Sequence, residues 1–311
     1  CIAPSVAIVR QTWNVMRRNF GDDWVARLDG ESKGSERDVS KPLVIATAAS
    51  AARQPQEWWD TRDLLVIDEF HHAAAETYHK INMLAKNVYY RFGFTGTHFR
   101  SGEDRLAMEA ICSHVIDKID LDDLTPNYLA TPRVVYTPVR GICRPEGNSW
   151  DALYRAGIVD HEARNDLVVK IANTVSATVP TIVLTRRRRH ADELGDRISN
   201  SVVAKGGASA LTSRSITEFL AGQHRVLVGT TVIGEGVDVP AAGALVFASG
   251  GDAGVAMMQS YFRPLTGAPG KSVGRIFDFR DLHHRTLRRH SDARISMARS
   301  QFGNENVVVG E

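Results

Sequence analysis

The chain has 311 residues, of which 43% are hydrophobic and 24% are charged, and its formal net charge is +2. This composition is ordinary for a soluble globular protein and excludes a uniformly basic one, and at roughly 100–200 residues per domain the length suggests two domains. The sequence has no apolar run near the roughly 18 residues of a membrane-spanning helix, and no signal-peptide pattern opens it.

The cysteines and the basic clusters indicate no special class of protein on their own. Cys1, Cys112 and Cys143 are widely spaced and form no CxxC pair, so we expect free thiols in a reducing compartment and no zinc site. Basic residues cluster at Arg186–Arg189 and across Arg285–Arg289, and such clusters can meet phosphates. Without further features they are more typical of a solvated face.

Short apolar runs alternate with amphipathic stretches along the chain, and Cys1–Pro4 already reads as the end of a buried strand. The amphipathic stretches predict helices at Ala163–Val175, Ala191–Ile198 and Ser215–Leu220. The apolar runs predict buried strands at Leu43–Thr47, Leu64–Ile67, Arg91–Thr95, Thr181–Thr185, Arg225–Gly229, Ala244–Ala248 and Val273–Phe279. Near-continuous apolar strands are typical of a parallel sheet covered on both faces, and their alternation with helices favours a doubly wound α/β fold.

The alternation is interrupted between about Asp120 and Asp160, where prolines and glycines gather. We predict a linker there, with a short strand at Arg133–Tyr136 and an irregular insertion. The linker divides the chain into two α/β domains, residues 1–130 and 131–311. Because a domain rarely begins in mid-strand, we also expect further polypeptide before Cys1, whether cleaved, encoded separately or left out.

Two adjacent carboxylates, Asp68 and Glu69, follow the apolar strand Leu64–Ile67. Since α/β folds bind ligands at the carboxyl ends of strands, one carboxylate could hold Mg²⁺ and the next could take a proton from an attacking water. His71 would face the same crevice. The competing interpretation is a strand end capped by solvated acids before a helix. The string Asp-Glu-Phe-His-His resembles the DExH box, which is motif II of superfamily-two helicases.

Other segments of the first half resemble further motifs of that family, in the family's order. A strand near residue 91 ends in the hydroxyl residues Thr95 and Thr97, as motif III does, although glycine and histidine stand where alanine and proline are usual. Such hydroxyls can bond to the acidic box and sense the nucleotide. A strand, a turn at Pro4 and Ser5 and a helix resemble motif Ia, and Thr47 ends the next strand. In the family, these last two segments touch the nucleic-acid backbone.

The strongest match in the second half is the string from Val226 to Pro240, which resembles motif V almost without gaps. Its glycines, Gly236 among them, let the backbone approach a ligand closely. The resemblance implies that Thr230 and Thr231 meet a phosphate of the nucleic acid. It also implies that Asp238 bonds a ribose hydroxyl.

The flanking segments resemble motifs IV and VI. Thr185 ends an apolar strand before the basic cluster, as in motif IV, and is expected to contact nucleic acid. Gln259 and Arg263 match motif VI, commonly QxxGRxxR, whose arginines cross the domain interface to neutralise the transferring phosphate. Phe262 replaces the glycine, and Thr266 stands where the second arginine is expected. The arginine finger is therefore expected to be lost, so that Arg263 serves alone or the motor is slow or inactive.

A superfamily-two motor also needs a phosphate loop, GxxxxGK[ST], before motif Ia. The only GKS of this chain is Gly270–Ser272, which follows motif VI, where relatives often carry a PGK turn. Because Leu265 stands at its first glycine position, we do not expect a working phosphate loop there. The segment Asp281–Arg294 resembles the closing helix of phage and restriction-type members, and we expect a solvated basic helix there rather than a metal site.

The resemblance covers nearly the whole chain and implies two RecA-like doubly wound parallel-sheet domains that face each other across a cleft, the first incomplete at its N-terminus. It implies an ATP-dependent DNA helicase or translocase of the phage-recombination or type III restriction kind. ATP and Mg²⁺ are the implied cofactors, DNA is favoured over RNA as the partner, and no membrane partner is expected. The implied compartment is the cytoplasm of a bacterium or of a phage-infected host.

By the same resemblance, each candidate residue has a role. The roles are a magnesium carboxylate (Asp68), a general base (Glu69), couplers of the site to the strand (His71 and Thr95), γ-phosphate contacts (Gln259 and Arg263) and further nucleotide contacts (Gly236 and Asp238).

Two alternatives stay open beside the helicase interpretation. One is a non-catalytic nucleic-acid-binding subunit, which the missing phosphate loop, Phe262 and Thr266 all favour. The other is the C-terminal piece of a split helicase that needs a partner chain for the phosphate loop. A companion polypeptide that ends in a strand, GKT and a helix would favour the split enzyme.

Overall fold

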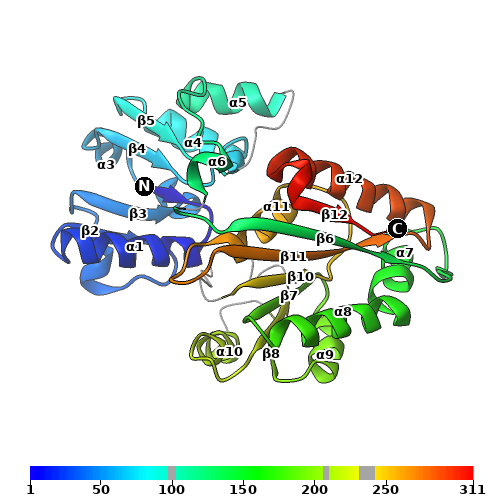
Figure 1. The fold of residues 1–311 in the computed structure, drawn as a ribbon. Helices are drawn as coiled ribbons and strands as arrows, with labels where there is room; N and C mark the ends of the chain where they lie inside the picture. The colour runs from blue at the N-terminus through cyan, green and yellow to red at the C-terminus, as the bar shows by residue number, and fades with distance from the viewer. Residues whose placement is uncertain (97–102, 126, 206–209, 231–241, 311) are drawn as a thin grey trace. The chain divides into compact units, whose positions relative to one another are not determined.

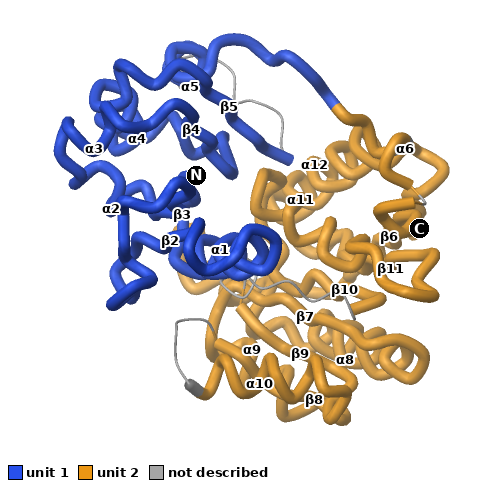
Figure 2. Tube along the Cα trace, turned by 90° about the vertical axis from the view of Figure 1, so that its left-hand side faces the viewer, with its two compact units in different colours: residues 1–118, 235–237 blue, residues 119–234, 238–311 orange. Residues whose placement is uncertain are grey.

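The structure, a computed structural model, describes residues 1–96, 103–125, 127–205, 210–230 and 242–310. These residues form two compact units, one from Cys1 to Lys118 and one from Ile119 onward (Figure 2). Each unit has its own sheet and its own core. The domain boundary at residues 130 and 131 stays a prediction, since compactness alone does not show which segments fold independently.

All strands of the first unit run parallel, in the order β2-β3-β1-β4-β5 (Figure 1). The strands are β1 (Ile2–Ala3), β2 (Val25–Leu28), β3 (Leu43–Thr47), β4 (Leu64–Ile67) and β5 (Tyr90–Gly93). The helices are α1 (Val6–Phe20), α2 (Ala48–Ala51), α3 (Gln56–Asp60), α4 (Glu76–Leu84) and α5 (Glu103–Cys112).

Neighbouring residues of these strands enter different apolar clusters, as the alternation of side chains in a strand requires. Val9 and Trp13 of α1 pack in a cluster with Ile45 of β3. Val44, the residue before Ile45, belongs instead to the cluster that holds Ile81 of α4. The sheet is therefore covered on both faces, which confirms the predicted doubly wound arrangement.

The two edges of this sheet differ. At one edge, β2 is buried along its length, and its Arg27 pairs with Glu36 at 3.0 Å. At the other edge, β5 carries the exposed side chains of Tyr90 (55%) and Phe92 (38%), and Phe94, the residue after the strand, is 60% exposed. No strand of the described residues pairs with the outer side of β5.

The second unit holds a larger sheet of parallel strands, in the order β12-β6-β11-β10-β7-β9-β8. The strands are β6 (Thr131–Val139), β7 (Thr181–Thr185), β8 (Ser201–Ala204), β9 (Val226–Thr230), β10 (Ala244–Phe247), β11 (Val273–Asp281) and β12 (Val307–Val309). The helices are α6 (Leu121–Leu124), α7 (Trp150–Tyr154), α8 (Glu162–Ser176), α9 (Arg188–Arg197), α10 (Ala210–Leu220), α11 (Val255–Phe262) and α12 (Arg285–Phe302).

The prediction of a linker between residues 120 and 160 is wrong. The expected short strand is the nine-residue β6, which lies inside the sheet between β11 and β12. The expected irregular insertion contains α7 and a π-helical turn at Arg155–Val159. This segment therefore belongs to the body of the second unit.

The prolines of β6 explain why the strand is hard to recognise. Alternate backbone groups of a parallel strand point to opposite neighbours, and Tyr136 O accepts a hydrogen bond of 2.9 Å from Gly310 N on the β12 side. Pro132 and Pro138 share this orientation but lie outside the register of β12, which spans only Val134–Tyr136. The missing N–H groups therefore cost no bond in the sheet.

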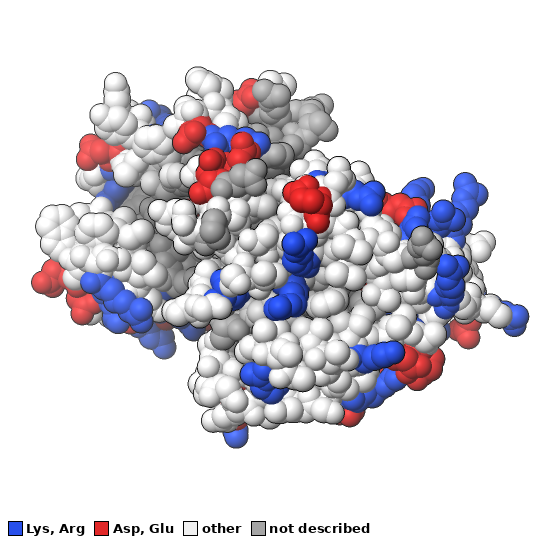
Figure 3. All heavy atoms as spheres, in the orientation of Figure 1, with Lys and Arg blue, Asp and Glu red and all other residues white. Residues whose placement is uncertain are grey.

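Charges of both signs are interspersed on the face that Figure 3 draws, in keeping with the net charge of +2. Contacts with a polyanion would therefore depend on local groups rather than on a field of one sign. Within the described ranges, no helix is both long enough and apolar enough to cross a membrane.

Candidate functional site

The carboxyl edge of the first sheet gathers most of the predicted site residues of that unit. In a parallel sheet, all strands present their carboxyl ends at one edge. Here Pro4 and Ser5 follow β1, Thr47 ends β3, Asp68 follows β4, and Thr95 comes two residues after β5. The register places Ala3 beside Thr47 and Ile67 beside Gly93, so these ends are level with one another.

The backbone turns sharply at the acidic pair. Asp68 N donates to Ile2 O at 2.9 Å, one residue past the end of β4. Glu69 then takes a left-handed conformation, with φ 49° and ψ 52°, and its N–H donates to Asp68 Oδ1 at 2.9 Å. A left-handed non-glycine residue costs of order 1–3 kcal/mol, and such strain gathers at functional sites.

The Asp68 carboxyl lies partly out of water. Burial raises its pKa, and the hydrogen bond from Glu69 N–H opposes the rise without cancelling it. A carboxylate whose charge is poorly solvated gains from a nearby cation. Mg²⁺ commonly takes one or two protein carboxylates, with water and phosphate oxygens as its remaining ligands. Asp68 fits that role, although no group of three or more metal-binding side chains occurs in the described part of the chain.

His71 connects the acidic pair to the strand end at β5. Its side chain is buried, and its Nδ1 lies 3.1 Å from Thr95 Oγ1 and 3.2 Å from Glu69 Oε2. A hydrogen on Nδ1 can be donated to either oxygen, so the ring can orient the Glu69 carboxylate. Phe70 N donates to Phe94 O at 2.8 Å, which brings the two strand ends together.

The hydroxyls of Ser5 and Thr47 cap helices. Ser5 Oγ accepts from Ile8 N at 3.3 Å at the start of α1, and Thr47 Oγ1 accepts from Ser50 N at 3.3 Å at the start of α2. A cap uses an oxygen lone pair and leaves the O–H able to donate. Each hydroxyl can therefore cap its helix and still donate its hydrogen to a phosphate oxygen. Capping alone is also enough to explain why these residues are present.

In the second unit, Thr185 and Thr230 lie side by side at the carboxyl ends of β7 and β9. Thr185 Oγ1 lies 3.2 Å from Arg187 O and 3.3 Å from Gly229 O. Thr230 is only 3% exposed, and its hydroxyl has no hydrogen-bond partner among the described residues. A buried hydroxyl without a partner is uncommon and calls for a ligand or water.

The basic cluster follows Thr185 directly and leads into α9. Arg187 pairs with Asp151, and Arg189 lies 3.5 Å from Asp160. Arg186 and Arg188 are exposed, and no carboxylate of the described residues lies within ion-pair distance of them. Positive charge at the positive end of a helix is unfavourable unless an anion is present. Sequence reasoning noted this cluster without assigning it to the site.

The remaining candidates lie on α11 or outside the described residues. Gln259 is on α11, and Arg263 begins the 3₁₀ turn after it. The structure does not describe Thr97, Thr231, Gly236 or Asp238.

The Gly270–Ser272 string leads directly into the strand β11, whereas a phosphate loop leads into a helix N-terminus. In addition, Lys271 Nζ donates to Ala242 O at 2.8 Å. Both observations agree with the expectation that this string is not a phosphate loop.

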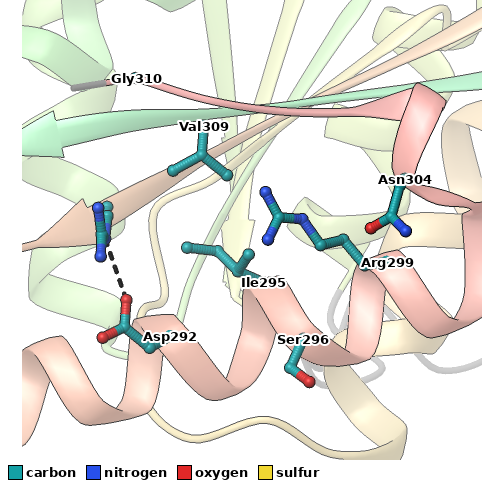
Figure 4. A pocket seen from close by; sticks show the side chains of 8 residues that line it. Asp292, Ile295, Ser296, Arg299, Asn304, Val309 and Gly310 are labelled. Carbon is teal, nitrogen blue, oxygen red and sulfur yellow. Dashed lines mark hydrogen bonds and ion pairs between the residues drawn. The ribbon is translucent and has the colours of Figure 1, made fainter.

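A hollow of about 650 Å³ lies beside α12 (Figure 4). Arg280 Nε donates to Asp292 Oδ1 across it at 3.0 Å. Its lining residues are Arg280, Asp292, Ile295, Ser296, Arg299, Asn304, Val309 and Gly310. None of the predicted site residues is among them, so the hollow is separate from the candidate site.

The comparison with known protein families gives a match within the first unit. Residues 1–100 match the family model described as type III restriction enzyme, res subunit. No curated protein sequence matches the chain at a significant level.

Solved structures match over both units. The chain aligns over its full length with S. cerevisiae Dbp5 bound to RNA and ADP BeF3, at 15% identity and a TM-score of 0.68, covering 76% of that chain. It aligns fully with a fragment of a putative HsdR subunit of a type I restriction enzyme from Vibrio vulnificus, at 16% identity and a TM-score of 0.69, covering 56% of that chain. For the Mycobacterium smegmatis helicase Lhr bound to ssDNA and AMP-PNP, the identity is 17%, the TM-score 0.63 and the coverage 97% of this chain and 42% of that one. The two parallel-sheet α/β units therefore have the RecA-like fold of helicase structures.

Proposed function

We propose that this chain is the core of an ATP-dependent DNA helicase or translocase, which couples ATP hydrolysis to movement on nucleic acid. The observation that carries the proposal is the meeting of Glu69, His71 and Thr95 beside Asp68 at the carboxyl edge of a parallel sheet. The helicase-like fold and the restriction-enzyme match of residues 1–100 support it. We propose the cytoplasm of a bacterium or of a phage-infected host as its location.

In this proposal, the acidic edge carries the chemistry. Bound Mg²⁺ would supply positive charge to the phosphates, and Asp68 would hold it. Glu69, turned out of the strand by its left-handed backbone, would accept the proton of the attacking water. His71 would keep the Glu69 carboxylate oriented and link it to Thr95, whose hydroxyl would respond to the nucleic acid.

The second unit would supply groups to the nucleotide as well. Gln259 and Arg263 would contact the terminal phosphate, and Gly236 and Asp238 would contribute further nucleotide contacts. Arg263 would act without a second arginine, because Thr266 stands in that position.

Nucleic acid would be held mainly by hydroxyl groups at strand ends. Among the described residues, the Thr230 hydroxyl has no hydrogen-bond partner, and Arg186 and Arg188 have no acidic partner. Both observations support a phosphate contact at that edge of the second unit. We favour DNA over RNA because of the restriction-enzyme match. The proposed contacts are Pro4, Ser5, Thr47, Thr95, Thr97, Thr185, Thr230 and Thr231.

A non-catalytic nucleic-acid-binding subunit is the second candidate function, and Phe262 favours it. This side chain stands where motif VI usually has glycine, and its ring packs against Phe302 at 5.4 Å between centroids. A related form of this candidate is a chain that needs a partner polypeptide for the phosphate loop.

ATP hydrolysis by the longest natural polypeptide that contains this chain, measured with and without single-stranded and duplex DNA, separates the candidates. We expect hydrolysis that DNA stimulates and that Glu69→Gln reduces at least 100-fold, the order of effect typical of losing a general base. DNA binding without hydrolysis would favour the second candidate. Hydrolysis by Glu69→Gln at the wild-type rate would refute the role of Glu69.

A further inference from the structure

The second unit buries two arginines and two aspartates in one network. Arg294 of α12 donates to Asp278 of β11 through Nε at 2.7 Å and Nη2 at 3.1 Å. Arg164 of α8 donates to Asp281 Oδ1 at 3.0 Å. All four side chains are at most 1% exposed. Because buried ion pairs often stabilise a fold no better than apolar packing, such a network suggests a role in fixing geometry.

The arginines of this network also hold the backbone that leads into α11. Arg164 Nη1 donates to Ala248 O at 2.8 Å, just after β10. Arg294 donates to Gly251 O, three residues before the Gly254 N-cap of α11. The entrance to the helix is therefore fixed by charged hydrogen bonds, which are stronger than neutral ones.

The far end of α11 is tied to the same network by a tyrosine. Tyr261 is fully buried, its hydroxyl donates to Asp278 Oδ2 at 2.5 Å, and it lies 3.0 Å from the Tyr136 hydroxyl of β6. Burial and the neighbouring Asp278 carboxylate raise the pKa of Tyr261 well above its usual value, so the phenol keeps its hydrogen.

Because of the helical repeat, the hydrogen bond between Tyr261 and Asp278 also restricts where Gln259 and Arg263 can point. Arg263 is the C-cap of α11 and keeps helical backbone angles, with φ −56° and ψ −50°. At about 100° per residue, Gln259 and Arg263 therefore lie on one side of the helix, and Tyr261 lies on the opposite side. A hydrogen bond with a defined direction restricts rotation of α11 about its axis more than apolar packing does.

We infer that Tyr261, held by Asp278 and Arg294, is a positioning residue that sets the orientation in which α11 presents Gln259 and Arg263. The inference rests on the proposed ATP hydrolysis for its consequence, but its structural part is independent of activity.

Tyr261→Phe is the variant that tests this. It is expected to fold, because Asp278 Oδ2 keeps its bond to Arg294 Nε. Tyr136→Phe/Tyr261→Phe removes both hydroxyls and leaves no unpaired phenol, so it provides a second folded variant. Thr181→Val is the control, since it removes a hydroxyl bond of 3.0 Å to Val179 O at the start of β7, which involves neither α11 nor the segment that leads into it.

Amide hydrogen exchange of the full chain gives the first readout. We expect residues 255–263 to exchange at least fivefold faster in both Tyr261 variants and at the wild-type rate in Thr181→Val. Equal exchange of this segment in Tyr261→Phe and Thr181→Val overturns the inference, whether or not the protein hydrolyses ATP.

The second readout is kinetic. We expect kcat for DNA-stimulated hydrolysis to fall about tenfold in Tyr261→Phe, because small misplacements of catalytic groups are costly, while KM for ATP stays within twofold. An unchanged kcat in an active wild-type background overturns the inference. Absence of ATP hydrolysis by the longest natural polypeptide that contains this chain refutes the proposed function, and the exchange readout then decides the positioning role alone.

Discussion

At the scale of single residues, the acidic edge combines a strained backbone with a poorly solvated charge. Glu69 takes a left-handed conformation and Asp68 has a raised pKa, and both features oppose stability. The motif in the sequence predicted which residue types gather at this edge. It could not predict the left-handed turn or the approach of His71 to Thr95, because both depend on contacts between strand ends that are distant in the chain. The roles of these residues stay predictions.

The raised pKa of Asp68 has a consequence for stability. The folded protein keeps the proton of Asp68 to a higher pH than the unfolded chain does, so the fold loses stability as pH rises above the usual range of an aspartate. We expect Asp68→Asn to raise Tm at pH 7 by about 2 °C or more, since the amide oxygen can still accept the Glu69 N–H bond. The gain should be smaller at about pH 4, near the usual pKa of an aspartate, because protonation of the carboxyl removes the poorly solvated charge.

Thermal unfolding at both pH values measures this effect, with Asp63→Asn as the control at the opposite, exposed end of β4. A Tm of Asp68→Asn at or below that of the wild type at pH 7 would contradict the assignment of an unfavourable buried charge.

At the scale of elements, strands were predicted accurately where the sequence has an uninterrupted apolar run. The bounds of β3, β4 and β7 match the predicted strands, because each is an uninterrupted apolar run. The strands β2, β8 and β12 were not predicted, since they are short and lie at sheet edges. β6 was mistaken for a linker because prolines in a sequence usually indicate the end of a strand. In β6, the prolines occupy positions where a backbone N–H would have no partner in the sheet, so they remove no hydrogen bond.

The π-helical turn after α7 makes a second testable element. A Cβ at Gly157 would lie 2.4 Å from Leu287 Cδ1 and 3.1 Å from Cys143 Sγ. Gly157→Ala is therefore expected to destabilise the second unit by about 1–3 kcal/mol through overpacking. Urea unfolding checks this, and Gly30→Ala, at an exposed position where a Cβ would meet nothing within 4 Å, is the control. Equal unfolding midpoints for the two variants would show that the turn adapts without cost.

At the scale of the whole molecule, each unit carries its own sheet and its own apolar cores. The α/β class was predictable from strand and helix alternation alone, whereas the strand order was not, because parallel neighbours need not be neighbours in sequence. In the first unit, β1 lies between β3 and β4. That order is what brings Ser5, Thr47 and Asp68 to adjacent strand ends.

The open edge of β5 bears on how the protein behaves in concentrated solution. An exposed edge strand offers unpaired backbone groups. No strand in the described part of the chain pairs with the outer side of β5, and the aromatic side chains of Tyr90, Phe92 and Phe94 are exposed there. Two copies could join their sheets edge to edge, so light scattering should rise with concentration more steeply than for a well-behaved monomer.

The variant Phe92→Lys places a charge on that edge. It should at least halve the rise of light scattering with concentration. A lysine at the exposed Leu211 of the second unit should leave it unchanged. The colloidal stability of the whole protein would then depend on one short strand.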